Sequence, residues 1–146
     1  MAGSPQYAHY ELRNITCIFG GILIDGYGAD DAVTVAFDVE AFTKTVGVDG
    51  LAVRNKMHDR TGTITITLSY ASATNDQLSG VYQADQLAST GAGVGPFTLR
   101  DRGGRTLFEA PYAWICDTPD LNFNSEAGSR VWMLHFQSGT MFAGGA

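Results

Sequence analysis

Hydrophobic and polar residues alternate along most of this chain, which is typical of β-strands that bury one face. The clearest run covers residues 63–69, where Ile64, Ile66 and Leu68 fall on one face and three threonines fall on the other. Shorter alternating runs lie at residues 13–19, 22–24, 33–39, 112–116 and 131–136. We therefore expect a chain built mainly of β-strands.

One segment follows a helical period instead. Between residues 74 and 88 a single stripe is formed by Leu78, Val81, Tyr82 and Gln86. Thr74 and Gln77 have the spacing of a capping box, which predicts a helix that begins at Thr74. A stripe on one face only indicates that this helix packs against a sheet. The glycine-rich residues 91–95 follow the helix and precede a strand, so they are interpreted as a connector and not as a phosphate-binding loop.

Two Gly-Gly pairs predict tight turns, because glycine tolerates the positive φ that such turns require. Gly20-Gly21 joins the first two alternating runs, and Gly103-Gly104 joins residues 97–101 to residues 106–109. A two-residue turn at the second pair places Phe97, Leu99 and Phe108 on one face and sets Arg102 opposite Arg105. A three-residue loop would pair Asp101 with Arg105 instead. The sequence is consistent with both registers.

The alternation weakens between residues 40 and 60, where Gly47 and Gly50 interrupt it and basic residues gather. We interpret this segment as a long irregular loop, and long ordered loops are usually functional. The whole pattern predicts one domain over residues 1–146, with residues 1–10 as an N-terminal arm. Its expected fold is an antiparallel β-sandwich or barrel with one packed α-helix.

The chain has few charged residues, and its net charge is negative. Charged residues make up 16% of the chain, against roughly 25% in a typical soluble domain. A low charge content favours a surface that partners cover. The net charge of −6 argues against non-specific nucleic-acid binding. Cys17 and Cys116 both lie in alternating runs, so two free, buried thiols are expected, as in a reducing cytoplasm. Neither a signal peptide nor a membrane-spanning segment is expected.

No set of residues indicates catalysis, a cofactor or a metal ion. His58-Asp59 is the only neighbouring pair of histidine and carboxylate. The acidic turn with Asp25, Asp30 and Asp31 lacks the spacing of an EF-hand. Three arginines near the second Gly-Gly pair lack the interleaved aromatic residues of a nucleic-acid site, so they favour contacts with a neighbouring subunit.

The order of several short motifs resembles the tail tube proteins of long-tailed bacteriophages, particularly those with contractile tails. The motifs are Val46–Gly50 followed by Arg54, Ser72–Ser79, Pro96–Asp101, Thr106–Phe108, Ala113–Ile115, Pro119-Asp120 and Arg130–Trp132. The resemblance covers about residues 10 to 137. It implies a non-enzymatic virion protein without a cofactor, made in the host bacterial cytoplasm. It also implies hexameric rings of this chain, stacked into a tube inside a tail sheath and bounded by tube-end proteins, through which DNA passes into the host.

The resemblance and the residue pattern together predict three functional surfaces. Residues expected to face the lumen are Thr34, Asp38, Glu40, Thr63, Thr65 and Thr67. Residues expected to make contacts between stacked rings are Lys44, Val48, Leu51 and Arg54. Contacts between subunits are expected from Arg100, Arg102 and Arg105, and the helix is expected on the outside of the ring.

Three other interpretations of the function are consistent with the sequence. The chain could form the tube of a contractile, secretion-type injection machine, because such tubes share this fold. It could be a standalone β-sandwich that binds carbohydrate, with Tyr7, Tyr10 and Tyr27 as the available aromatic residues. It could also be an enzyme with a site around His58 and Asp59.

Overall fold

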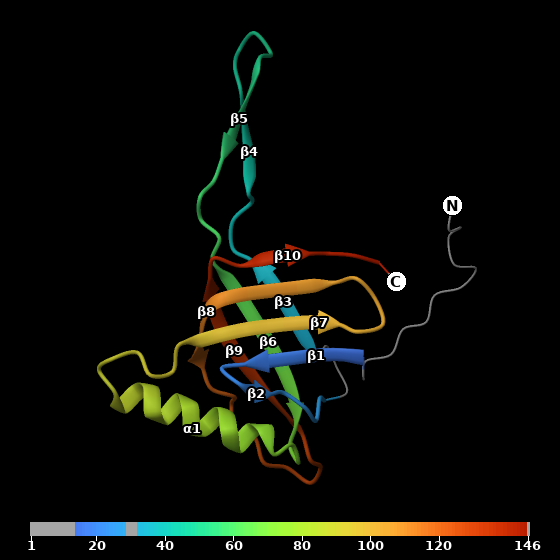
Figure 1. The fold of residues 1–146 in the computed structure, drawn as a ribbon, viewed down its shortest axis with the longest axis vertical. Coiled ribbons are helices and arrows are strands. Elements are labelled where there is room, and N and C mark those ends of the chain that lie inside the picture. The colour runs from blue at the N-terminus through green and yellow to red at the C-terminus, as the bar shows by residue number, and fades with distance from the viewer. Residues whose placement is uncertain (1–13, 29–31, 146) are drawn as a thin grey trace, which may run out of the picture.

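The computed structural model describes residues 14–28 and 32–145, and it shows a mainly antiparallel β protein with one helix (Figure 1). The strands are β1 (Ile15–Phe19), β2 (Ile22–Leu23), β3 (Val33–Phe37), β4 (Phe42–Val46), β5 (Ala52–Lys56), β6 (Gly62–Ser69), β7 (Gly95–Asp101), β8 (Leu107–Asp117), β9 (Ser129–Gln137) and β10 (Thr140–Phe142). The helix α1 (Thr74–Leu87) lies between β6 and β7. The predicted fold class is confirmed. Among the described residues, no helix has the length and apolar character needed to cross a membrane.

The larger sheet has the strand order β2-β1-β7-β8-β9-β6-β3, and β10 also pairs with β8. The long strand β8 connects the two halves of this sheet. Its first residues pair with β7 and β10, whereas its last residues pair with β9. The register of β8 shifts near Ile115, which is the mark of a β-bulge and bends a strand. The bend lets the two halves face each other across one core.

The core is made by the inward-facing residues of both halves. Ile64, Ile66 and Leu68 of β6 are fully buried, as the alternation predicts. Phe136 of β9 meets Phe108 of β8 edge-on, with 4.8 Å between ring centroids. Fully burying one such side chain contributes about 1.5–3 kcal/mol to stability. These aromatic contacts therefore hold the two halves together.

The helix begins at Thr74, as predicted, but without the predicted capping box. Thr74 lies in its first turn, Ala73 is the N-cap residue, and no side chain caps the helix. The Thr74 hydroxyl instead accepts a hydrogen bond from the backbone N–H of Asp25, at 3.2 Å, so the capping-box prediction is wrong. Leu78 is buried and its two apolar neighbours on the stripe are half-buried, but Gln86 is exposed.

Both Gly-Gly turns form. The first joins β1 to β2, with Ile18 opposite Leu23. At the second, Leu99 lies opposite Phe108, which is the register of the two-residue turn. Arg102 and Arg105 nevertheless do not pair with each other. Their backbone N–H groups donate to the carbonyls of residues 14 and 145, at 2.9 Å each, because both flanking segments lie against this turn.

Residues 42–56 are not the irregular loop that was expected. They form a two-stranded hairpin, β4 paired with β5, which extends away from the body of the molecule (Figure 1). The N–H of Gly47 donates to the carbonyl of Leu51, and Gly50 has a φ of 86° in the turn. The prediction was wrong because it relied on a buried face to reveal each strand, and this hairpin buries neither face.

Candidate functional site

The projecting hairpin brings the predicted stacking residues together. Lys44 pairs directly with Arg54 across its two strands. The Arg54 guanidinium lies over the ring of Phe42, 3.8 Å from the centroid, and this cation–π contact orients the charge. Val48 at the tip is fully exposed, and Leu51 is 65% exposed. One small element thus carries basic side chains along one face and aliphatic side chains at its tip.

Exposed apolar side chains make this hairpin a candidate surface for contact with a partner. Besides the two tip residues, sequence reasoning missed Phe42, Val46 and Val53, which are also exposed. A hairpin of two strands is at best marginally stable in water, and soluble monomers rarely expose contiguous apolar surface. The expected gain from burying these side chains makes the hairpin the strongest candidate for an assembly surface.

The threonines predicted to face the lumen share one face of the sheet. β3 pairs with β6, so that Thr34 lies opposite Thr65. Thr63 and Thr65 are half-buried, whereas Thr67 is 8% exposed and contributes little surface. Asp38 and Glu40 follow the end of β3 and are both exposed.

The same face also carries residues that sequence reasoning did not assign. β9 places His135 opposite Thr63 and Met133 opposite Thr65. Trp114 of β8 meets His135 edge-on, with 6.2 Å between ring centroids. The face is therefore partly aromatic and apolar. Only the strand order reveals these neighbours, because β6, β8 and β9 are distant in the chain.

Both described cysteines are free, but only one is in the core. Burial raises the pKa of the Cys17 thiol to about 12, although a hydrogen bond with Tyr27 lowers it slightly. Burial also raises the pKa of the Tyr27 hydroxyl. Cys116 is half-buried on β8, and its thiol donates to the carbonyl of Met133 at 3.4 Å. The prediction that Cys116 is buried was wrong, because its side depends on the bulge in β8.

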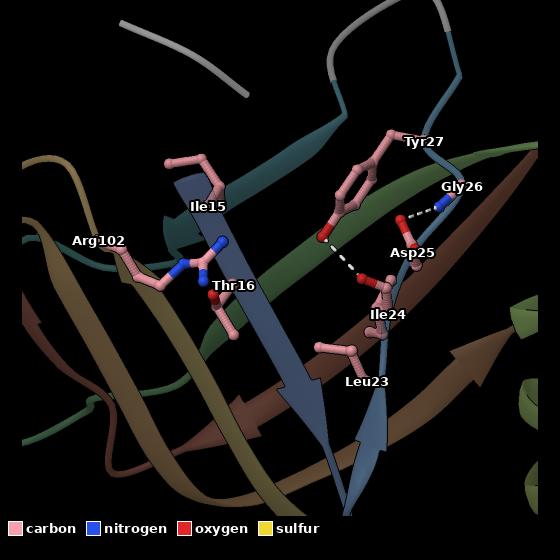
Figure 2. A pocket seen from close by; sticks show the side chains of 8 residues that line it. All are labelled: Ile15, Thr16, Leu23, Ile24, Asp25, Gly26, Tyr27 and Arg102. Carbon is pink, nitrogen blue, oxygen red and sulfur yellow. Dashed lines mark hydrogen bonds between the residues drawn. The ribbon is translucent and has the colours of Figure 1, made fainter. Parts of the chain in front are cut away.

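The three arginines lie at the β7–β8 end of the molecule. Arg100 is exposed on β7, whereas Arg102 and Arg105 lie in the turn. Arg102 lines a pocket of about 500 Å³ between β1 and the segment after β2, and its side chain extends toward β1 near Thr16 (Figure 2).

Tyr27 points into the same pocket, and its hydroxyl donates to the carbonyl of Ile24 at 3.1 Å (Figure 2). It is half-buried against the core, so it does not form the exposed platform that carbohydrate binding would use. Tyr7, Tyr10, Asp30 and Asp31 lie outside the described residues.

His58 and Asp59 are both exposed, between β5 and β6. One oxygen of Asp59 accepts the side-chain O–H of Thr61 at 2.6 Å and its backbone N–H at 3.0 Å, which lowers the pKa of the carboxyl group. These bonds give Asp59 a local role in the turn. Within residues 14–28 and 32–145, no group of three or more His, Cys, Asp or Glu side chains could hold a metal ion.

The end of the body opposite the hairpin has a second surface that the sequence did not indicate. The loop between β8 and β9 exposes Leu121 and Phe123, at 70% and 76%. The guanidinium of Arg130 lies 5.5 Å from the ring centroid of Phe123 and 5.1 Å from that of Tyr70. A hollow of about 220 Å³ beside the loop is lined by Asn75, Ser79, Thr118, Pro119, Leu121, Arg130 and Trp132.

Comparison with known proteins finds a matching family and a relative in sequence. The model of the family described as "Bacteriophage PhiTE tail tube protein" matches residues 7–142. "Structural protein ORF10" of Pseudomonas phage KPP10 is 27% identical over 122 residues, which cover 84% of this chain and 70% of that protein.

Solved structures with the same fold include a cap, a sheath-tube complex and a sheath/tube terminator. The anti-feeding prophage cap, described as a tube terminating cap, has a TM-score of 0.60 at 9% identity and covers 97% of this chain and 95% of its own. The sheath-tube complex of the extracellular contractile injection system PVC has a TM-score of 0.58 at 10% identity, covering 91% and 90%. The sheath/tube terminator of the same system has a TM-score of 0.59 at 9% identity, covering 95% and 100%. At these identities the likeness shows a shared fold.

Proposed function

Because this chain belongs to the bacteriophage PhiTE tail tube protein family, we propose that its copies assemble into stacked hexameric rings that form the tube of a phage tail. Membership in a structural family favours a non-enzymatic role in the virion. In this proposal a tail sheath surrounds the tube, tube-end proteins bound it, and DNA passes through the lumen into the host. The structural neighbours support these partners, because they include a tube terminating cap, a sheath-tube complex and a sheath/tube terminator.

The projecting hairpin is the observation that carries the proposal. It extends along the long axis of the molecule and exposes aliphatic side chains at its tip (Figure 1). A tube of stacked rings requires each subunit to reach along the tube axis to the next ring. Lys44, Val48, Leu51 and Arg54 are the residues that we propose for this contact.

Contacts within a ring are proposed at the ends of the sheet. β2 and β3 are its outermost strands, each with one edge that is unpaired among the described strands. Unpaired edges invite pairing with another chain. Arg100 and Arg102 lie beside β1 and the residue before it, and Arg105 lies against residues 144–145. All three are proposed to meet an acidic neighbouring subunit.

The threonine face of β3 and β6 is proposed to line the lumen. Hydroxyl groups from Thr34, Thr63 and Thr65 provide a neutral, hydrated surface, and Asp38 and Glu40 add negative charge at its edge. Like charges repel DNA phosphates, which would reduce adhesion during transit. Thr67, at 8% exposure, contributes little to this wall.

A substitution at the hairpin tip tests the proposal. Val48→Asp combined with Leu51→Asp places two charges where apolar contacts are expected, so tubes should be lost from negative-stain images. The fold should remain, because neither side chain contacts the core, and circular dichroism and thermal unfolding measure this. Leu87→Asp is the matched control, since Leu87 is 88% exposed on the helix. Normal tubes from the double variant would contradict the role of the hairpin.

A contractile injection machine is the second candidate, favoured by the fold shared with PVC tubes. Mass spectrometry of purified particles separates the two. The phage proposal expects this chain in DNA-containing virions, and its presence only in particles without a capsid would favour the alternative.

A further inference from the structure

The two ends of the molecule carry opposite charges. The hairpin, residues 42–56, holds Lys44, Arg54 and Lys56 against one acidic residue, Asp49. These three are a third of the chain's nine basic residues, although the chain as a whole has a net charge of −6. The other end holds Asp117, Asp120 and Glu126 within residues 117–128, a stretch without lysine or arginine.

The shapes of these ends are complementary as well. Val48 and Leu51 project from the hairpin tip, and the hollow beside the β8–β9 loop is lined in part by Pro119, Leu121 and Trp132. Interfaces commonly place apolar anchors in such hollows and surround them with polar contacts. Figure 1 shows the hairpin and the β8–β9 loop at opposite ends of the long axis, so one molecule cannot join its own two ends.

We propose that the β8–β9 end of one copy is the receptor for the hairpin of the next copy along the tube. The inference rests on the proposed function and names the partner surface that the hairpin would meet. Such a head-to-tail contact joins two different patches of the same chain, which generates an open filament when the contact does not close. The aliphatic tip occupies the hollow, and the basic side chains of the hairpin face the three carboxylates.

Among the described residues that line the hollow, Arg130 is the one with a basic side chain. Its guanidinium lies over the rings of Tyr70 and Phe123, which holds the charge against these rings. Counting Arg130, residues 117–130 still hold three acidic residues against one basic residue. The attraction between the two ends therefore remains.

The lysines of this chain allow a direct test, because Lys44 and Lys56 are its only two and both lie on the hairpin. A carbodiimide joins an amine to a carboxylate only when the two are in contact. Assembled full-length protein, mixed from nitrogen-14 and nitrogen-15 batches, should give peptide pairs that join Lys44 or Lys56 to Asp117, Asp120 or Glu126. The isotope mixture identifies links between different copies.

The control keeps the charge of the hairpin and removes its two lysine amines. Lys44→Arg combined with Lys56→Arg should still assemble and should lose these linked pairs. If the links between different copies join the lysines only to other carboxylates, the receptor assignment is overturned. Tubes in the same sample would leave the tube proposal intact. If microscopy of the same sample shows neither rings nor tubes, the proposed function fails, and this inference fails with it.

Discussion

Glycine 62 shows how closely the core is packed at the level of one residue. It begins β6, and it is buried between β3 and β9. A Cβ atom at this position would collide with the carbonyl oxygen of Ala36 and with the ring of Phe136. The backbone of β3 cannot yield as a flexible side chain would, so the position requires glycine.

Replacing this glycine should therefore destabilise the protein. Gly62→Ala is expected to lower the free energy of unfolding by about 1–3 kcal/mol, the usual cost of overpacking a core. Gly80→Ala is the control, because Gly80 lies within α1 with nothing near its missing Cβ. That substitution should raise the free energy of unfolding by up to about 1 kcal/mol. Urea denaturation measures both, and equal stability for the two variants would contradict this packing.

Cys17 makes stability depend on pH in the alkaline range. Its pKa in the folded protein is about 12, against a usual value of 9.0. The folded state keeps the thiol proton where the unfolded state loses it, so stability is complete below pH 9 and falls above it. The slope approaches about 1.4 kcal/mol per pH unit. Above pH 10 the raised pKa of Tyr27 lowers the free energy of unfolding further.

Denaturation at pH 8, 9 and 10 measures this dependence. Cys17→Ala should remove most of the loss of stability between pH 9 and pH 10, because the remaining thiol, Cys116, is only half-buried, although burial raises its pKa as well. An unchanged slope in that variant would show that another group is responsible.

At the scale of elements, the helix is held to the body by polar contacts with distant segments. Thr74 accepts the backbone N–H of Asp25, and the hydroxyl of Ser72 donates to the carbonyl of Asp25 at 2.6 Å. Farther along, the indole N–H of Trp132 donates to the side-chain oxygen of Asn75 at 3.0 Å. These bonds fix the start of α1 against both the β2–β3 connection and β9.

Removing one of these bonds should loosen the start of the helix. Thr74→Val keeps the shape of a buried side chain but leaves the Asp25 N–H without its acceptor, which costs about 1–3 kcal/mol. Thr34→Val, on an exposed strand position, is the matched control and should change stability little. Hydrogen exchange at Asp25 measures the local effect, and unchanged protection would argue against this bond.

The sequence predicted those elements that bury one face against the core. Ile64, Ile66 and Leu68 mark β6 because each points inward, and the same logic finds β9 and the apolar stripe of α1. It missed the β4–β5 hairpin, whose two faces are both exposed, so that no alternation separates inside from outside. It also gave Thr74 a capping role, since local spacing cannot show an acceptor bond to a residue 49 positions away.

The candidate surfaces were predictable only in part, for the same reason. The charges of Lys44 and Arg54 made them candidates in the sequence, and the structure shows that they lie opposite each other across β4 and β5. No pattern in the sequence distinguished Leu121 and Phe123. Their exposure beside the hollow is what makes them a candidate contact surface. Trp114 and His135 join the threonine face only through the order β8-β9-β6.

At the scale of the whole molecule, several features of the subunit favour assembly with other copies. The chain has a low charge content, strands at both ends of the sheet with one unpaired edge each among the described strands, and a hairpin with exposed apolar side chains. Association with other copies would cover these surfaces and pair these edges. An isolated subunit would leave each of them exposed to water. The family to which the chain belongs supplies the form of the assembly, which is a tail tube.

Electron microscopy of the purified full-length protein tests this claim most directly. We expect rings with six-fold symmetry that stack into hollow tubes as the concentration rises. A protein that stays monomeric at every concentration, with no rings or tubes in the images, would contradict it.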